Sequence, residues 1–395
     1  MRTVSFIVSL LFALTLSAQS DFDIAQEFMS KKGVTLSKEN KASTRGEDKP
    51  YSIFNGEDGK GFAIVANGIV IGYSTENTCD GYPFPSVATT RGILDPKTPI
   101  DYLVKCTWGQ GKPYNDSVPL RVNDKGEEVR CYSGCGATAV AQVMYYYKNK
   151  GCEALPKFVK QTGLTLEALP ETTFNWDLIL PKYEYYYGSK WKNYDETHGR
   201  EIAKLMKYVG YALKTSYHYN GSGSWIEPEY LLPLGFSEES YTTRHDPGMG
   251  NLSDSDLEAI FDKELEKGRP VIMAGYQIDG GGHYYVIDGR DDTGRYHVNR
   301  GGNGQNDGYY IISQDLFFGT DKGEVDGLLY ELDRVFCVVP IMPKGWVIPT
   351  DIETVKEDRV SNGMVYNLQG QKVGVLLEGL PKGIYIKDGK KYIVK

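Results

Sequence analysis

A cysteine followed by a run of small and apolar residues is the first candidate for chemistry in this chain. Cys135 opens the stretch Cys135–Met144, whose composition predicts a buried helix that starts at the cysteine. A thiol at a helix N-terminus lies at the positive end of the helix dipole, which favours the nucleophilic thiolate. Taken alone, the stretch still favours an inert buried cysteine, because free cysteines are among the most buried residues.

A nucleophilic thiol needs a base, and His283 has suitable surroundings. It follows three glycines and opens an apolar run, so we expect it at the start of a strand, where other groups can approach closely. The interval from Cys135 to His283 fits the separation of roughly 130–150 residues found in papain-like enzymes. Asn299 ends the next short apolar run and could accept a hydrogen bond from the imidazole, which would complete a Cys-His-Asn triad.

The oxyanion formed during acyl transfer needs preorganised hydrogen-bond donors. The backbone N–H of Cys135 is one candidate, because the first N–H groups of a helix have no partner within it. The side chain of Gln110, in a loop rich in glycine and proline, is another. Each of these residues alone is more often structural. Their combination, at this spacing, indicates acyl transfer by a cysteine nucleophile.

Three motifs around these residues resemble motifs of the streptopain family of secreted bacterial cysteine peptidases. The family pattern G-C-x-A-T-A-x-A-Q-x-M is similar to Gly134–Met144, and G-G-H-x-x-V-x-D-G is similar to Gly281–Gly289. The pattern W-x-Q-x-x-P-Y-N is similar to Trp108–Asn115, and H-V-N-W-G-W is matched only in part. The resemblance covers roughly residues 95–341.

The resemblance implies a function and a role for each candidate residue. The chain would be a cysteine endopeptidase made as a zymogen, acting on protein or peptide substrates without a cofactor. The implied catalytic residues are Cys135 as nucleophile, His283 as base, Asn299 as the group that orients the base, and Gln110 as oxyanion donor. The residues implied beside the substrate are Gly282, Ser222 and Gly223.

One departure from the family pattern concerns Arg300, which stands where the family has a tryptophan directly after the asparagine. The planar guanidinium could stack on the imidazole. If it points inward, its charge would disfavour the imidazolium and favour the thiolate. This substitution motivates an alternative function, a catalytically impaired peptidase-like protein that binds peptides. A further alternative is another acyl-transfer enzyme that uses the same triad.

The expected fold class is α+β, with a two-lobed papain-like catalytic domain that combines a helical lobe and an antiparallel β lobe. A small α/β pro-domain would precede it and act as an intramolecular inhibitor, and a short β-rich tail would follow. The tail resembles C-terminal modules that either sort or stabilise secreted bacterial proteins. The expected divisions are a signal peptide over 1–18, the pro-domain over 19–94, the peptidase over 95–342 and the tail over 343–395.

The spacing of apolar residues and the positions of turn and capping residues predict the main helices and strands. Apolar residues at helical spacing predict helices over 21–32, 199–213 and 256–267, the last with a capping box from Ser255 and Glu258. Asn67-Gly68 predicts a tight hairpin between two strands. Further strands are expected over 271–276, 284–287, 296–299, 309–312 and 335–339.

Composition and charge exclude several classes of protein. The net charge is −8 and no basic run occurs, so nucleic acid is not an expected partner. The scattered histidines and the absence of C-x-x-C and H-E-x-x-H motifs give no support to a metal site. The apolar N-terminal stretch is too short to span a membrane and reads as a secretory signal, so we expect a secreted or cell-surface protein. In that compartment Cys131 and Cys135 could form a disulfide, which would block the nucleophile.

Overall fold

The computed structural model forms two compact units, residues 1–348 and 349–395. The expected signal peptide and the expected boundaries after residues 94 and 342 lie outside the described residues. Among the residues described, no helix is both long and apolar enough to cross a membrane. The described ranges are 19–38, 51–79, 96–149, 169–186, 191–237, 239–244, 253–277, 282–312, 330–337, 364–367, 372–374, 380–381, 383–387 and 390–394.

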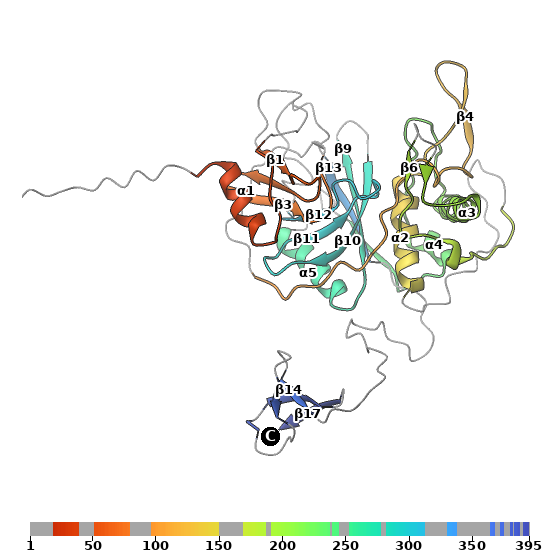
Figure 1. Cartoon of the computed structure of the whole chain (residues 1–395). Helices are drawn as coiled ribbons and strands as arrows, with labels where there is room; N and C mark the ends of the chain where they lie inside the picture. The colour runs from red at the N-terminus through yellow and green to blue at the C-terminus, as the bar shows by residue number, and fades with distance from the viewer. Residues whose placement is uncertain are drawn as a thin grey trace, which may run out of the picture. The chain divides into compact units, whose positions relative to one another are not determined.

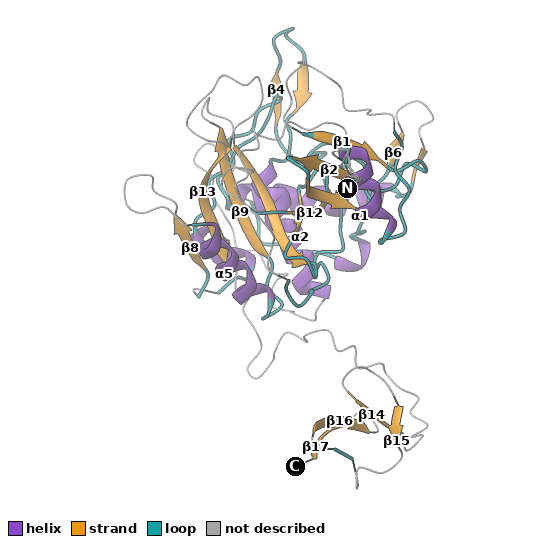
Figure 2. Ribbon diagram, turned by 90° about the vertical axis from the view of Figure 1, so that its left-hand side faces the viewer, coloured by secondary structure: helices purple, strands orange, loops and turns teal. Residues whose placement is uncertain are grey.

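The first unit is α+β and is built on a nine-stranded sheet with the order β1-β2-β3-β12-β11-β10-β9-β13-β8. Every pairing in this sheet is antiparallel, and Figure 2 shows its strands running from β8 at one side to β1 at the other. The strands are β1 Ser52–Asn55, β2 Phe62–Ala66, β3 Ile69–Ser74, β8 Tyr241–Arg244, β9 Val271–Gln277, β10 Gly282–Arg290, β11 Tyr296–Asn299, β12 Gly308–Tyr310 and β13 Tyr330–Cys337.

Three of the helices gather on one side of this sheet (Figure 1). They are α2, α3 and α4, and α2 packs directly against β10. Two small hairpins, β4–β5 and β6–β7, complete this part. Their strands are β4 Leu120–Val122, β5 Glu128–Arg130, β6 Tyr185–Tyr186 and β7 Trp191–Lys192. The helices are α1 Asp21–Ser30, α2 Cys135–Asn149, α3 Glu196–Ala212, α4 Pro228–Leu231 and α5 Asp254–Leu265, with short 3₁₀ turns η1 Trp176–Leu178 and η2 Leu232–Leu234.

Strand β10 separates two hydrophobic cores, because its successive side chains point to opposite faces. Tyr284 and Val286 belong to the core that includes α2 and α3. Tyr285 and Ile287 belong to the core that includes α5. The strand that carries His283 is therefore anchored on both faces, which fixes the position of its first residues.

The N-terminal module, defined as residues 19–79, is continuous with the main sheet. Its strand β3 pairs with β12 through Tyr73 opposite Tyr309 and Gly72 opposite Tyr310. Helix α1 packs on β1, β2 and β3 over a small core of its own. The N-terminal module belongs to the same compact unit as the main sheet.

Most predicted elements are confirmed, with shifts at their ends. The hairpin at Asn67-Gly68 joins β2 to β3 as expected. The predicted cap of α5 is wrong by one half-turn: the capping box is formed by Ser253 and Asp256. Asp256 accepts hydrogen bonds from both the backbone N–H and the hydroxyl of Ser253, so the earlier of two overlapping patterns begins the helix.

The second unit is the β tail, a four-stranded antiparallel sheet with the order β15-β14-β16-β17. Val365 and Tyr385 are buried in it. The expected hairpin near residue 388 is confirmed, because Lys387 pairs with Lys390. The strands are β14 Val365–Asn367, β15 Lys372–Gly374, β16 Gly383–Lys387 and β17 Lys390–Val394.

Candidate active site

The predicted nucleophile lies at the first residue of α2. Cys135 is 8% exposed, and the preceding Gly134 has a φ of +94°. A Cβ at Gly134 would lie 3.2 Å from the carbonyl oxygen of Ser222, so glycine fits both the backbone conformation and the space. The cysteine is therefore fixed by a turn that only glycine can make without strain.

The thiol of Cys135 is free, as is that of Cys131. The disulfide between them that the sequence allowed is not formed. Burial raises the pKa of the Cys135 thiol, and the backbone N–H groups of Tyr284, Gly136 and Cys135 itself lower it by a smaller amount. The N–H of Tyr284 is the amide directly after His283, so the segments of nucleophile and base meet at the sulfur.

The predicted base, His283, lies at the start of β10. Its Nε2 is 2.9 Å from the carbonyl oxygen of Arg300. A carbonyl oxygen only accepts, so Nε2 carries the proton and Nδ1 of the neutral ring is free to take one up. Burial lowers the pKa of the imidazole to about 4; the hydrogen bond to Arg300 opposes this change, and the charge of Arg300 adds to it.

Asn299 makes no hydrogen bond to the imidazole among the described residues, contrary to the prediction. Its Oδ1 accepts hydrogen bonds from Nε2 of Gln142 at 2.8 Å and from the N–H of Gly301 at 3.0 Å. Its Nδ2 donates to the carbonyl oxygen of Cys106 at 2.9 Å. An amide oxygen has two lone pairs, and both are occupied here. In the described part of the chain, the ring of His283 is held instead by the backbone carbonyl of Arg300, the residue after Asn299.

Arg300 itself is 7% exposed. Its backbone N–H donates a hydrogen bond to Oδ1 of Asp307 at 2.7 Å. Its guanidinium carbon lies 5.2 Å from the ring centre of Tyr285. Tyr285 contacts His283 edge-on, with ring centres 5.0 Å apart. The arginine therefore acts on His283 through its carbonyl and through its charge.

The predicted oxyanion residue, Gln110, lies in a loop tied to the segment before Cys135. The carbonyl oxygen of Gln110 accepts the N–H of Ser133 at 3.0 Å. Nδ2 of Asn115 donates to the carbonyl oxygen of Cys131 at 2.8 Å. These bonds place the loop beside the start of α2, and Gln110 is partly exposed there.

The predicted substrate loop also lies beside the start of α2, through the contact between Ser222 and Gly134. The hydroxyl of Ser222 bonds the carbonyl oxygen of Tyr132 at 2.6 Å. The N–H and carbonyl of Gly223 are both paired with Ser216. Gly282, the third predicted residue, pairs with Tyr276 at the start of β10. The structure thus brings all three predicted segments to the region of Cys135 and His283.

A second histidine from the partly matched motif lies outside this arrangement. Nδ1 of His297 is 2.6 Å from Oδ1 of the fully buried Asp288, and its ring stacks on Tyr102. A cavity of about 350 Å³ on this side is lined by His297 and Asn299 but not by Cys135. Among the described residues, no cluster of His, Cys, Asp or Glu could hold a metal ion.

Gln142 is the site residue whose role the sequence did not indicate. It belongs to the cysteine motif, but the sequence analysis assigns it no catalytic or binding role. One feature of the sequence could have indicated it: Gln142 is the single amide side chain in a predicted buried helix of mostly small and apolar residues. A buried polar group needs a hydrogen-bond partner, so such a residue is expected to make a specific contact.

Comparisons with known proteins show which family the chain resembles. The model of the peptidase C10 family matches residues 108–310. Streptopain of Streptococcus pyogenes serotype M1 is 30% identical over 311 residues, which span 66% of this chain and 73% of that protein. The thiol protease/hemagglutinin PrtT of Porphyromonas gingivalis is 25% identical over 343 residues, spanning 73% of this chain and 38% of that protein.

A solved structure also resembles this chain. It is a mutant fragment of prointerpain A from Prevotella intermedia, with a TM-score of 0.54 and 25% sequence identity. The match covers 76% of this chain and 98% of that one.

Proposed function

The chain belongs to the peptidase C10 family and is a cysteine-type peptidase, and on that premise we propose that Cys135 and His283 carry its chemistry. The observation that carries the proposal is the hydrogen bond between Nε2 of His283 and the carbonyl of Arg300. It leaves Nδ1 as the basic atom, on a residue whose following N–H favours the thiolate of Cys135.

The proposed reaction has two steps. The thiol proton of Cys135 passes to Nδ1 of His283 as the sulfur attacks the scissile carbonyl. The C–N bond then breaks, the imidazolium gives its proton to the leaving amine, and a thioester remains. Water attacks the thioester, His283 takes its proton, and the C–S bond breaks to release the acid and restore the thiol.

Burial favours the neutral form of both reacting groups. The thiol has a raised pKa and the imidazole a lowered one, so each is favoured in its neutral form. The proton therefore moves during the attack, with His283 as a general base. The backbone N–H of Cys135 and the side chain of Gln110 are the proposed donors to the oxyanion, because Cys135 begins α2 and the loop of Gln110 is hydrogen-bonded to the segment before it.

Asn299 has a positioning role in this proposal. It fastens the turn 299–301 to Gln142 and to the carbonyl of Cys106. That turn presents the carbonyl of Arg300 to His283. The third element of the triad is thus shared between the side chain of Asn299 and the backbone of the residue after it.

The biological setting is also part of the proposal. We infer a secreted or cell-surface endopeptidase that is made as a zymogen, with the N-terminal module as its inhibitor. Protein and peptide substrates would lie along the segments of Ser222, Gly223 and Gly282. Since the hydrogen-bonding groups of Gly223 are already paired, it would contribute shape and not backbone bonds.

The test compares the purified precursor with its Cys135→Ala variant. Wild type should cleave casein, react with a thiol-directed inhibitor and generate a new N-terminus on incubation. The Cys135→Ala variant should do none of these. Cys131→Ala is the matched control, because Cys131 is also buried and free. Casein cleavage or maturation that persists in Cys135→Ala would contradict the proposal.

A further inference from the structure

Gln142 connects the helix of the nucleophile to the turn that holds the base. It is fully buried in α2, and its Nε2 donates to Oδ1 of Asn299 at 2.8 Å and to the carbonyl of Cys106 at 3.2 Å. Asn299 itself donates to the same carbonyl. The amide of Gln142 therefore closes a small network in which helix α2, strand β11 and the segment before α2 meet.

One face of α2 carries Cys135, Thr138 and Gln142, because residues three, four and seven apart lie on the same side of a helix. The hydroxyl of Thr138 contacts the carbonyl of Gly109, next to Gln110. Its methyl group lies 3.2 Å from the position of a Cβ at Gly301, the last residue of the turn. The face that presents the nucleophile thus contacts both the oxyanion loop and the turn of the base.

A role in stability alone does not explain the amide of Gln142. Its Oε1 is buried and has no hydrogen-bond partner among the described residues. A buried acceptor without a partner carries a desolvation cost, and an apolar side chain of the same shape would avoid it. What the amide provides and an apolar side chain does not is a directed bond to the oxygen of Asn299.

We propose that Gln142 is a positioning residue for the peptidase reaction: its bond to Asn299 sets the place of the Arg300 carbonyl, and so the orientation of His283 relative to Cys135. This inference rests on the proposed roles of Cys135 and His283. The route runs from Nε2 of Gln142 to Oδ1 of Asn299, which also accepts the N–H of Gly301, and the turn between them presents the carbonyl that holds the imidazole.

The experiment uses Gln142→Met, which keeps the length of the side chain and removes the donor. We expect kcat to fall by about 10²-fold with KM little changed, since a base displaced by about 1 Å loses a factor of this size. The rate of Cys135 alkylation should fall as well. Tyr146→Phe is the matched control: it removes one buried hydrogen bond of the same helix, to the carbonyl of Gly268, which is not part of the turn. It should lower the melting temperature without lowering kcat.

A second variant keeps the test decisive if Gln142→Met does not fold. Gln142→Glu has a similar size and shape, and its carboxyl donates a hydrogen bond to Asn299 only when it is protonated. Its activity relative to wild type should therefore rise as the pH falls, a response that a loss of packing would not give. The thermal melt shows at each pH that the variant is folded.

The outcomes separate this inference from the proposed function. A wild-type kcat in folded Gln142→Met would overturn the positioning role alone. So would an activity of Gln142→Glu, relative to wild type, that does not change with pH. Activity that survives in Cys135→Ala would remove the premise instead. Wild-type activity with a selective loss of kcat in Gln142→Met would support both.

Discussion

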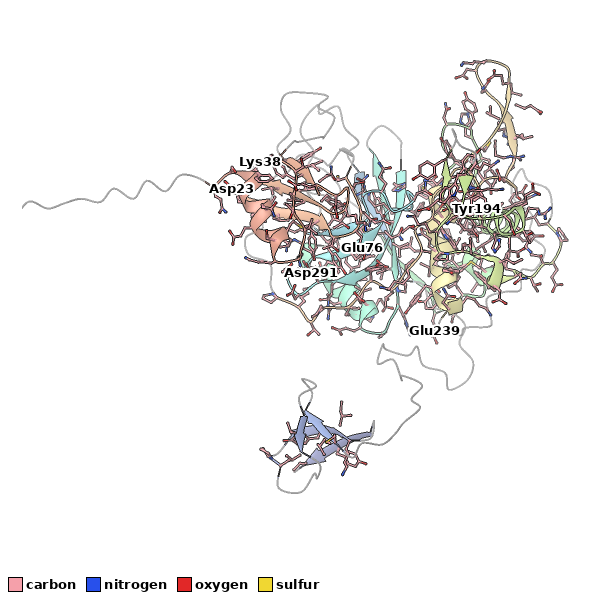
Figure 3. The ribbon with its side chains drawn as sticks, in the orientation of Figure 1. Asp23, Lys38, Glu76, Tyr194, Glu239 and Asp291 are labelled. Atoms are coloured by element: carbon pink, nitrogen blue, oxygen red, sulfur yellow. The ribbon has the colours of Figure 1, made fainter. Side chains whose placement is uncertain are left out.

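The segment from β11 to β12 is held at two junctions that differ in construction. At the first, side chains of α2 hold the turn 299–301 through Gln142 and Asn299. At the second, β12 pairs with β3 of the N-terminal module through the backbone. Buried side chains support that second junction: Tyr73 donates to Asp291 at 2.8 Å, and Arg295 donates to the carbonyl of Val70. Figure 3 labels Asp291, at the N-terminal module's side of the unit.

The difference between the junctions separates chemistry from stability. The α2 junction contacts the turn that orients His283, so a change there should alter the reaction. The β3 junction holds a module that we propose is removed on maturation, so a change there should alter the stability of the precursor. The predictions below test this division, from the largest expected effect to the smallest.

The largest effect should follow from removing the base. His283→Ala should lower kcat/KM by about 10³-fold or more, since His283 is the proposed acceptor of the thiol proton. Casein cleavage by purified, folded protein measures it. His198→Ala is the control, because His198 lies on α3 with Asp195 as its partner. Similar losses in the two variants would mean that His283 has no special role.

A smaller effect should follow from Gly301→Ala at the α2 junction. Gly301 has a φ of +66°, which costs alanine about 1–2 kcal/mol. The new methyl group would also press on Thr138. We expect a displaced turn and a fall in kcat of about tenfold. Gly302→Ala is the control, because its Cβ would make only an ordinary contact at 3.7 Å. Unchanged kcat in Gly301→Ala would argue against the turn's role.

The pH dependence should report the environment of His283. Since its pKa is lowered to about 4, the acid limb of kcat/KM should lie near that value, below the ordinary range of histidine. The unfolded chain binds the imidazole proton more readily than the folded chain does. His283 therefore makes the folded protein less stable as the pH falls from the ordinary pKa of histidine towards 4. An acid limb at the ordinary histidine value would show that the imidazole is not desolvated.

The smallest effect should appear at the β3 junction. Tyr73→Phe removes the hydrogen bond to Asp291 and should destabilise the precursor by about 1 kcal/mol. Chemical denaturation measures the change. Tyr309→Phe is the control, because its ring stacks on Tyr73 and its hydroxyl makes no hydrogen bond within the described residues. A Tyr73→Phe precursor that is as stable as wild type would break the division between the junctions.

Local patterns predicted most of the fold. The helix at Cys135, the hairpin at Asn67-Gly68 and strands β9 to β12 follow from periodicity and glycine punctuation. The pairing of β3 with β12 was not predictable, because it joins segments more than two hundred positions apart and depends on no local signal. The cap of α5 was misplaced because Ser253 and Ser255 are each followed three residues later by an acid.

The candidate site was predicted by residue type, and its connections were not. Motifs indicated Cys135, His283, Gln110 and Asn299. The contact of His283 with a backbone carbonyl has no sequence signal, because every residue carries the same group. The contact between Gln142 and Asn299 likewise depends on how α2 packs against the sheet.

The central claim is that His283 is the base for the thiol of Cys135. The most direct test is the rate of iodoacetamide alkylation at each cysteine, resolved by peptide mass spectrometry, in wild type and in His283→Ala. We predict that Cys135 reacts much faster than the buried thiols of Cys79, Cys106 and Cys131, and that this advantage disappears in His283→Ala. A Cys135 that reacts equally fast in both proteins would contradict the account.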